Sequence, residues 1–402
     1  MGERNLDFDR IIERRGTDCL KYDRPRPAGM PDDMLSFWVA DMDFRVSSYI
    51  QDALTERVAH GIFGYTEVYD DFFEPLHDWM LHRHGWEVKP EWLIQTPGVV
   101  YALAMAVKAY THPGEAVLIQ QPVYYPFSEV IEDNGRRLVN SSLCLTSGNR
   151  YEMDFDDLEE KIRTQHVRLF LLCNPHNPGS RAWTREELIR VGELCLKYDV
   201  IVVSDEIHED FVFTGAHQVF ANLRPEFADI SITCTSPSKT FNLAGLQISD
   251  IFIPNPALRE AFRLQNAAAG YSQLNTAGLI AARAAYRDGG EWYEAMIAYV
   301  RENIRTLQGY IAAHLPQIHV IEPEATYLVW LDLRGLHLSQ QALSDLIIKK
   351  AGLWLDDGAI FGADGVGFER INAACPRSLL LEALGRLERA VHEIAGRSGS
   401  NL

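Results

Sequence analysis

Short apolar runs alternate with longer amphipathic segments between Leu93 and Pro254. The runs have the length of strands, and Ile201-Val202-Val203 is apolar throughout, as expected for a strand covered on both faces. The predicted strands are Ala116–Gln120, Arg137–Asn140, Leu169–Cys173, Val200–Ser204, Ile230–Cys234 and Ile248–Ile253. The predicted helices between them are Val99–Tyr110, Phe127–Asp133, Phe155–Arg163 and Arg185–Lys197. This pattern predicts an α/β fold with a doubly wound, mostly parallel sheet, in which ligands bind beyond the carboxyl ends of the strands.

The flanking parts of the chain carry a different pattern. Helices are predicted at Ser48–His60 and Asp70–His84, each closed by a glycine, and a short apolar strand running into an acidic turn is predicted within Ser36–Phe44. The later elements are a long helix from about Glu291 to His314, strands at His319–Glu322, Tyr327–Asp332 and Glu369–Asn372, and helices at Ser339–Lys350 and Ser378–Ala395. We therefore expect a large domain over residues 46–287, and a smaller α+β domain made of residues 1–45, which include an N-terminal arm, and 288–402.

Composition and charge narrow the class of protein. The 402 residues are 47% hydrophobic and 23% charged, which is ordinary for a soluble globular protein. The formal net charge of −18 argues against nucleic acid or an anionic membrane as the main partner. The six cysteines show no metal-binding spacing, so we expect free thiols, no metal site and a cytoplasmic location. The first six residues lack the apolar core of a signal peptide, and the apolar helix candidate at 99–110 is too short to span a membrane.

The most informative stretch surrounds Lys239. Residues 229–234 alternate polar and apolar side chains, which predicts a strand that delivers the lysine to the end of a sheet. The segment that follows, Phe241 to Leu246, carries no charge that could pair with the lysine. Loss of hydration lowers the pKa of a lysine, and a neutral amine is what Schiff-base formation requires. Because a lone lysine is usually exposed in a polar turn, this interpretation depends on companion residues.

Two companions suit a phosphorylated, planar ligand. Pro97-Gly98 precedes a helix that opens at Val99 and Val100, and free N–H groups at a helix start bind phosphate. Tyr124 follows a predicted strand, where its ring could stack on a planar ligand. Taken alone, the first motif also fits a simple turn, and the second also fits a tyrosine of the core.

Two further companions supply polar side chains at strand ends. Asn174-Pro175 and Asn177-Pro178 turn the chain sharply after a predicted strand and leave amide side chains facing the crevice. Asp205 follows the most apolar strand, so its carboxylate is expected deep in the fold, where it needs a cationic or strongly hydrogen-bonding partner. A protonated ring nitrogen of a cofactor is one such partner. The alternative for Asp205 is a cap on the following turn.

Together these motifs resemble the fold-type I pyridoxal-phosphate (PLP) enzymes of the class I/II aminotransferase superfamily. The order and spacing match from Trp38 to Pro376, including the 28 positions from Asn177 to Asp205 and the 34 from Asp205 to Lys239 (205 − 177 and 239 − 205). Within the superfamily, the segments most similar to the cystathionine β-lyase, or carbon–sulfur lyase, branch of the MalY/PatB type are residues 38–44, 63–66, 97–100, 174–179, 205–208 and 238–247.

The resemblance implies roles for individual residues. Lys239 would bind the cofactor covalently, Asp205 would pair with the protonated pyridine nitrogen, and Tyr124 would stack on the ring. Further implied contacts are Asn177 and His208 to the ring oxygen, Val99, Val100, Ser236 and Ser238 to the phosphate, Arg370, Ala40 and Asn177 to the substrate, and Tyr65 to the phosphate across the interface of a homodimer. Two positions depart from the wider superfamily: Gln247 stands where many aminotransferases have arginine, and Tyr101 is bulky beside the phosphate loop.

The expected reaction is a PLP-dependent α,β-elimination on cystathionine or a related cysteine S-conjugate. Lys239, released when the substrate amine replaces it on the cofactor, would remove the α-proton, and a thiolate would leave the β-carbon. Hydrolysis of the resulting aminoacrylate gives pyruvate and ammonia. An aminotransferase is the chief alternative, against which His208 and Gln247 weigh. A PLP-fold binding or regulatory protein without turnover is the second alternative, and the presence of Lys239, Asp205 and Arg370 weighs against it.

Overall fold

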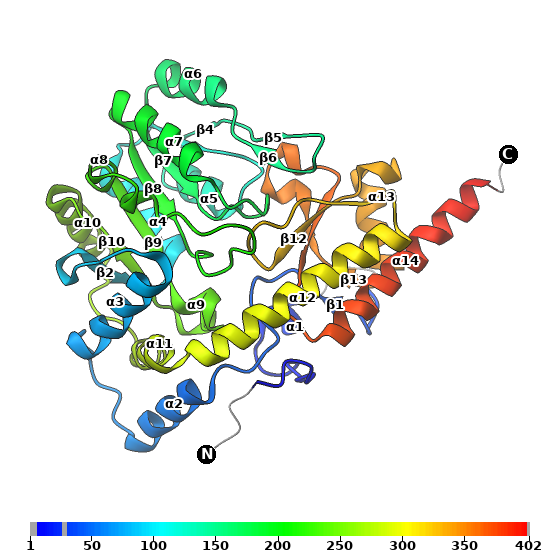
Figure 1. Cartoon of the computed structure of the whole chain (residues 1–402), viewed down its shortest axis with the longest axis horizontal. Coiled ribbons are helices and arrows are strands. Elements are labelled where there is room, and N and C mark those ends of the chain that lie inside the picture. Colours follow the sequence, from blue (N-terminus) through cyan, green and yellow to red (C-terminus); the bar gives the residue numbers. More distant parts are fainter. Residues whose placement is uncertain (1–5, 26–29, 400–402) are drawn as a thin grey trace.

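The computed structural model describes residues 6–25 and 30–399. Parts of the predicted N-terminal arm, residues 1–5 and 26–29, and the last residues 400–402 lie outside the described part. Among the described residues the largest sheet has seven strands in the order β2-β10-β9-β8-β7-β3-β4 (Figure 1). These are β2 (Leu93–Thr96), β10 (Ser249–Phe252), β9 (Ser231–Thr235), β8 (Ile201–Asp205), β7 (Val167–Cys173), β3 (Ala116–Ile119) and β4 (Arg137–Asn140). Strand β10 runs opposite to the other six strands of this sheet, so the predicted mostly parallel, doubly wound arrangement is confirmed.

Helices cover both faces of this sheet. The surrounding helices are α2 (Ser48–His60), α3 (Asp70–His84), α4 (Val99–Tyr110), α5 (Pro126–Glu132), α6 (Phe155–Gln165), α7 (Arg185–Lys197), α8 (Pro225–Ala228), α9 (Pro237–Thr240), α10 (Pro256–Ala268) and α11 (Thr276–Asp288). Alternate residues of β7 pack in opposite directions: Leu169 belongs to the cluster with Leu103 of α4, and Phe170 to the cluster with Leu188 of α7. Burial on both sides explains why these strands read as continuous apolar runs.

A second, antiparallel sheet is built from the later part of the chain. Its strand order is β11-β12-β15-β14, and two short pairs, β1 with β13 and β5 with β6, lie apart from it. The strands are β11 (His319–Val320), β12 (Leu328–Asp332), β15 (Phe368–Asn372), β14 (Asp356–Asp357), β1 (Leu35–Ser36), β13 (Leu353–Trp354), β5 (Cys144–Leu145) and β6 (Tyr151–Glu152). The helices here are α1 (Leu20–Asp23), α12 (Gly290–His314), α13 (Gln340–Asp345), which continues into a wider turn at Leu346–Lys350, and α14 (Arg377–Gly399). The smaller α+β unit is therefore present, while its predicted boundaries at residues 46 and 287 stay a prediction.

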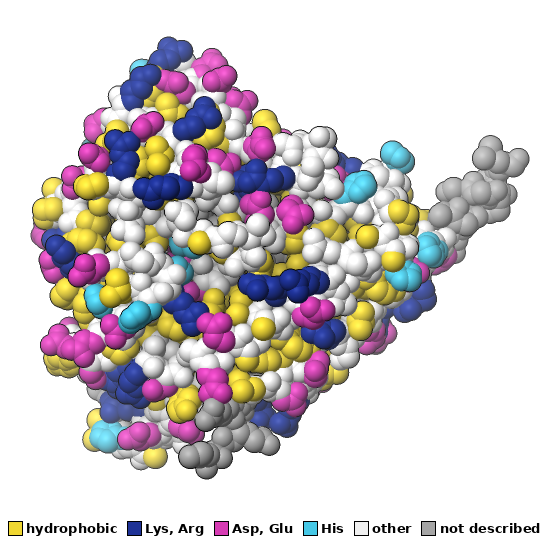
Figure 2. Space-filling view, viewed as in Figure 1, with side chains coloured by type: hydrophobic (Ala, Val, Ile, Leu, Met, Phe, Trp, Pro, Cys, Tyr) yellow, Lys and Arg dark blue, Asp and Glu magenta, His cyan; other side chains and the backbone are white. Residues whose placement is uncertain are grey.

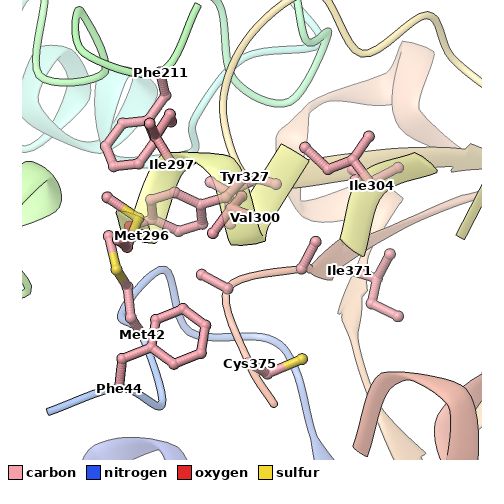
Figure 3. Packing of buried hydrophobic residues seen from close by; sticks show 14 of the residues in the cluster. Met42, Phe44, Phe211, Met296, Ile297, Val300, Ile304, Tyr327, Ile371 and Cys375 are labelled. Carbon is pink, nitrogen blue, oxygen red and sulfur yellow. The ribbon is translucent and has the colours of Figure 1, made fainter. Parts of the chain in front are cut away.

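Helix α12 connects the two parts. In Figure 1 it runs from beside α11 toward the smaller sheet, with α14 along its far half. Figure 3 shows Met296, Ile297 and Val300 of α12 around Tyr327, with Met42 and Phe44 of the N-terminal part close by. These residues belong to one buried cluster, so the core continues from one part of the chain into the other.

Several predicted elements differ from the structure. The strand predicted within Ser36–Phe44 is confined to β1, because side chains rather than a strand ladder bind the backbone that follows: Asn372 Nδ2 donates to the carbonyls of Val39 and Asp41, and Asn242 Nδ2 to those of Met42 and Phe44. Strand β2 and helices α10 and α11 were not among the predicted elements. Elsewhere the predicted helices and strands differ from the observed ones by a few residues at most, apart from the helix at 339–350, whose second half is the wider turn.

The surface carries mixed charge on the face shown in Figure 2, where basic and acidic side chains are interspersed. None of the described helices is both long enough and apolar enough to cross a bilayer.

Candidate active site

Lys239 lies in the short helix α9, directly after β9, at the carboxyl end of the large sheet. Its Nζ donates a hydrogen bond to the carbonyl oxygen of Ala40 at 2.8 Å. Burial lowers the pKa of this amine to about 8, although the carboxylates of Asp41 and Asp205 oppose the shift. The predicted lowering of the pKa is confirmed. At pH 7 roughly a tenth of the amine is therefore neutral and able to act as a nucleophile or base.

Asp205 is the last residue of β8 and is 5% exposed. Burial raises the pKa of its carboxyl to about 7, while the hydrogen bond donated by the Ile207 backbone N–H and the charge of Lys239 oppose this. No ion pair to Asp205 is found among the described residues. A cation placed beside such a buried carboxyl group would stabilise its ionised form, which is the kind of partner that the sequence predicts for Asp205.

Asn177, His208 and Arg370 come together from three segments far apart in the sequence. Arg370 on β15 is 2% exposed, and its Nη1 donates to Asn177 Oδ1 at 3.1 Å. Burial and the positive charges of Lys239 and Arg370 hold the pKa of His208 well below its usual value, so the imidazole is neutral. Its Nδ1 is buried and has no hydrogen-bond partner in the described part of the chain. The ring therefore presents an unused polar atom near the cavity that contains Lys239.

The start of α4 offers backbone N–H groups. Gly98 precedes the helix with φ at +143°, a conformation that side-chain-bearing residues rarely adopt, and Val99 and Val100 form the first turn. Both valines and Ser238 line the same cavity as Lys239. Ser236 does not line it, because its hydroxyl donates to the Ile248 carbonyl at 2.7 Å and accepts from the Ser238 N–H at 3.0 Å. Its assignment as a phosphate ligand stays a prediction.

The cavity that joins these residues measures about 250 Å³. Its wall includes the predicted residues Ala40, Val99, Val100, Tyr124, Asn177, Asp205, His208, Ser238 and Lys239, together with Tyr101 and Gln247. Tyr124 packs against Tyr125 with ring centroids 5.1 Å apart, and burial raises the pKa of its phenol. The structure therefore gathers into one cavity residues that the sequence placed at five separate strand or helix ends.

Tyr65 lies outside this cavity. It is 94% exposed and lines a shallow depression with Phe63 and Tyr271. Pro97 and Gln247 line both this depression and the main cavity, so the two adjoin.

Two contacts in the site were missed by sequence reasoning. Tyr327 donates its hydroxyl proton to the Ala40 carbonyl at 2.9 Å, so that oxygen accepts hydrogen bonds from both Tyr327 and Lys239. Asp356 forms an ion pair with Arg370 Nη2, which also donates to the carbonyl of Trp38 at 2.9 Å. Neither residue stands in a motif with recognisable chemistry. For Asp356 the only sequence feature that could have indicated a buried role is its position as an acidic residue in an apolar context, in Leu-Asp-Asp-Gly before the glycine-rich loop.

The comparisons with known proteins agree with this geometry. Residues 41–387 match the family described as aminotransferase class I and II. The chain belongs to this family. Cystathionine beta-lyase PatB of Bacillus subtilis is 44% identical over 387 residues, covering 96% of this chain and all of the relative. Protein MalY of Escherichia coli is 31% identical over 393 residues, covering 97% and 100%. Among solved structures, cystalysin from Treponema denticola, which contains a pyridoxal 5′-phosphate cofactor, superposes with a TM-score of 0.93 at 35% identity, covering 96% and 99% of the two chains.

As a member of the aminotransferase class I and II family, the protein uses PLP as its cofactor. The side chains that line the cavity also fit PLP by their chemistry, independently of the comparisons. Lys239 supplies an amine with a lowered pKa, while among the described residues Asp205 is a buried carboxyl without an ion pair and His208 has a ring nitrogen without a hydrogen-bond partner. The start of α4 supplies N–H groups and the positive end of a helix dipole, which suit a phosphate.

Proposed function

We propose that this protein is a carbon–sulfur lyase that performs α,β-elimination on cystathionine or a related cysteine S-conjugate, giving a thiol, pyruvate and ammonia. The observation that carries the proposal is a lysine with a lowered pKa in one cavity with Asp205 and beside Arg370, in a chain 44% identical along its length to a cystathionine β-lyase. His208 and Gln247, both in the cavity wall, are the residues that favour a lyase over an aminotransferase.

Arg370 would bind the α-carboxylate of the substrate. Its guanidinium is planar and held by Asn177 and by the Trp38 carbonyl, so it is already oriented before a ligand arrives. The neighbouring Ala40 would contact the substrate from the N-terminal segment. Orientation of the carboxylate fixes the α-carbon relative to Lys239, which is where the proton must be removed.

Lys239 would act as the base that takes the α-proton. Its pKa of about 8 lies close enough to neutral pH for the free amine to accept a proton and later return it. Bound PLP supplies the electron sink that accepts the charge left on the α-carbon. Asp205 would keep the cofactor nitrogen protonated, Tyr124 would stack on the ring, and neutral His208 together with Asn177 would contact the ring oxygen.

The phosphate would be held by backbone N–H groups of Val99 and Val100 and by the hydroxyl of Ser238, joined by that of Ser236 once its proton turns from the Ile248 carbonyl to the phosphate. Gln247 contributes no charge, so the affinity for the phosphate would come mainly from the helix start and the serines.

A homodimer would complete the site. Five large apolar side chains on α2 and the segment that follows it are more than 60% exposed, which is typical of a surface covered by a partner. They are Val58, Ile62, Phe63, Tyr65 and Tyr69. We infer that a second copy covers them and that Tyr65 reaches the phosphate of the partner's cofactor. The free cysteines, four of them buried, are consistent with a cytoplasmic location.

The assignment is tested by incubating the holoenzyme with cystathionine and with S-alkyl cysteines while pyruvate and free thiol are measured. Stoichiometric release of both is expected. Amino transfer from glutamate to a 2-oxo acid without pyruvate formation would identify an aminotransferase instead. Binding of amino acids without either reaction would identify a non-catalytic protein.

A further inference from the structure

The segment that follows β8 carries acidic side chains that the active site does not use. Asp205 and His208 line the cavity that contains Lys239, whereas three carboxylates of the same segment do not. These carboxylates meet two histidines, one at the end of α3 and one in the loop that precedes Phe220. The group, here called the buried cluster, consists of Glu206, Glu209, Asp210, His84 and His217.

The buried cluster is shielded from solvent and carries an excess of negative charge. The side chains of His84 and His217 are 4% and 3% exposed. Three ionised carboxylates exceed two protonated imidazoles by one charge, and no lysine or arginine of the described residues forms an ion pair with these carboxylates. Without a metal, a proton on Glu209 would remove the excess, and burial raises the pKa of its carboxyl. A bound cation would do the same while leaving the carboxylate ionised.

Glu209 supplies the atom that points to a ligand. Its Oε2 is buried and has no hydrogen-bond partner in the part of the chain that the structure describes. This oxygen lies 3.8 Å from His84 Nε2. Glu209 also belongs to two sets of three residues whose ligand atoms lie within 4.8 Å of one another, one with His84 and Asp210 and the other with Glu206 and His217. A buried oxygen without a donor is the acceptor that a metal ion would satisfy.

The spacing of the buried cluster fits a tetrahedral zinc ion, whose nitrogen and oxygen ligands stand about 3.4 Å apart. His84 Nε2 lies 3.0 Å from Asp210 Oδ1 and 3.8 Å from Glu209 Oε2. His217 Nε2 lies 2.7 Å from Glu206 Oε2. Two imidazoles on one such ion have ring centres about 5 Å apart, and those of His84 and His217 are 5.5 Å apart. Small movements of these side chains would bring both histidines onto one ion.

Neighbouring hydroxyl and N–H groups hold the other oxygens of two carboxylates. Glu206 Oε1 accepts from the Ser204 hydroxyl at 2.7 Å and from the Phe220 N–H at 3.0 Å. Asp210 Oδ2 accepts from the Thr240 hydroxyl at 2.6 Å. Such bonds orient metal ligands, and here they leave one oxygen of each carboxylate beside an imidazole.

We propose that the buried cluster binds one Zn²⁺ ion per chain through His84, His217 and Glu209, with Asp210 or Glu206 as the fourth ligand. Two imidazoles favour zinc over magnesium, which prefers oxygen ligands. The ion would be structural, since its ligands lie outside the Lys239 cavity, and its uptake would release the protons held by the ligands.

This zinc site does not depend on which reaction the protein catalyses. The expectation of no metal site rested on cysteine spacing, which could not reveal a cluster assembled from the end of α3, the segment after β8 and the following loop.

The test incubates the holoenzyme with Zn²⁺, removes free metal on a desalting column and measures bound zinc by mass spectrometry. We expect about one equivalent per chain and a melting temperature several degrees above that of the chelator-treated holoenzyme, with no such rise in Mg²⁺. Glu209→Gln keeps the size of the side chain and should weaken zinc binding by about tenfold or more, measured by competition with a chelator. Without zinc this variant should melt no lower than wild type, because a buried charge has been removed.

His82→Gln is the matched control for His84→Gln, because His82 lies exposed on the same helix and outside the buried cluster. His84→Gln should lose the bound zinc and the rise in melting temperature, and His82→Gln should keep both. A wild-type holoenzyme that retains no zinc would overturn the proposal, as would unchanged affinity in Glu209→Gln and His84→Gln, which would assign the uptake to surface histidines. Pyruvate release by the same samples tests the lyase assignment separately, and its absence would leave the zinc site standing.

Discussion

The amine of Lys239 sets the pH dependence of the first chemical event. With a pKa of about 8, roughly a tenth of the amine is neutral at pH 7, compared with well under a thousandth for an ordinary lysine. Covalent capture of PLP by the cofactor-free protein should therefore accelerate by about tenfold per pH unit from pH 6 and level off above pH 8. Stopped-flow absorbance at several pH values measures this. Acceleration that continues up to pH 10 would mean that the pKa is not lowered, and Lys239→Ala should abolish capture.

Asp205 makes a pH-dependent contribution to stability that has the opposite sign from an ordinary surface carboxylate. Its pKa is about 7 in the folded protein against an ordinary value of 3.8, so the folded state binds the proton more tightly than the unfolded chain does. Ionisation therefore costs stability, a cost that is absent below pH 4 and complete above pH 7. In cofactor-free protein, Asp205→Asn should melt several degrees above wild type at pH 8, and the gap should close as the pH falls toward 4.

The holoenzyme should respond to Asp205→Asn in the other direction. If the carboxylate keeps the cofactor nitrogen protonated, kcat should fall by about a hundredfold or more, with Lys239 still able to capture PLP. Asp205→Glu, which keeps the charge, should retain more activity than Asp205→Asn. Equal loss in both variants would argue for a role in shape alone.

Most of the site could be predicted from the sequence because its residues follow strands. Lys239, Asp205, Asn177 and Tyr124 each stand within a few residues of a recognisable apolar run, and a parallel sheet brings such ends to one edge. Tyr327 and Asp356 could not be placed in the same way, since their contacts depend on how the smaller sheet sits against the larger one.

At the scale of elements, the segment Phe37–Phe44 is held by asparagine side chains instead of a strand partner. Asn372 is fully buried, donates to Val39 and Asp41 at 2.7 and 2.6 Å, and accepts from the Ala374 N–H at 2.8 Å. These bonds fix the Ala40 carbonyl between them, to which Lys239 donates.

Asn372→Ala should reduce both stability and activity. Loss of three buried hydrogen bonds should lower the free energy of unfolding by about 2–4 kcal/mol, and kcat should fall because the segment that contacts Lys239 and the substrate loses its support. Urea unfolding and pyruvate release measure the two effects. Asn222→Ala is the control: its side chain is exposed and donates a single bond to Gly85, so a loss under about 1 kcal/mol is expected. Equal losses in the two variants would contradict the argument.

Helices with clear end signals were predicted with their observed limits. Thr184 and Glu187 form a reciprocal capping box at the start of α7, and Gly61 and Gly85 end α2 and α3 in the left-handed conformation. Helix α10 carries comparable signals, Asn255 and Pro256, yet was missed because the preceding strand pattern had ended and no strand followed. Tertiary contacts decided the segment after Ser36, where local pattern alone favoured a longer strand.

At the scale of the whole molecule, the proposed homodimer makes each site depend on two chains. Lys239→Ala subunits lack the amine, and Tyr65→Phe subunits lack a phosphate ligand for the partner. In a mixed dimer one site would carry both defects and the other would be intact. Mixing the two variants under conditions of subunit exchange should therefore raise activity well above the mean of the separate proteins, approaching a quarter of the wild-type value when dimers form at random.

The activity of the mixture shows whether Tyr65 acts in the site of the partner subunit. No gain on mixing, with a dimer confirmed by light scattering, would place Tyr65 in the site of its own chain or outside any site. A monomer of full activity would remove the dimer from the mechanism. Mixing Lys239→Ala with Asp205→Asn is the control, since both defects lie in the cavity of one chain and the mixture should show no gain beyond simple dilution.

Helix α12 packs against both parts of the chain, so we expect the two parts to unfold together. Its buried residues share one apolar cluster with Phe72 of α3, Leu328 of β12 and Leu384 of α14, so the smaller sheet is buried by a core that it shares with the larger part of the chain. Heating should therefore produce one calorimetric peak instead of two, and a protease should find no cut that releases a folded half. Substitutions at one end of this helix must then remain compatible with the packing at its other end. The smaller sheet, which carries Arg370, and the larger sheet, which carries Lys239, are therefore expected to change together in evolution.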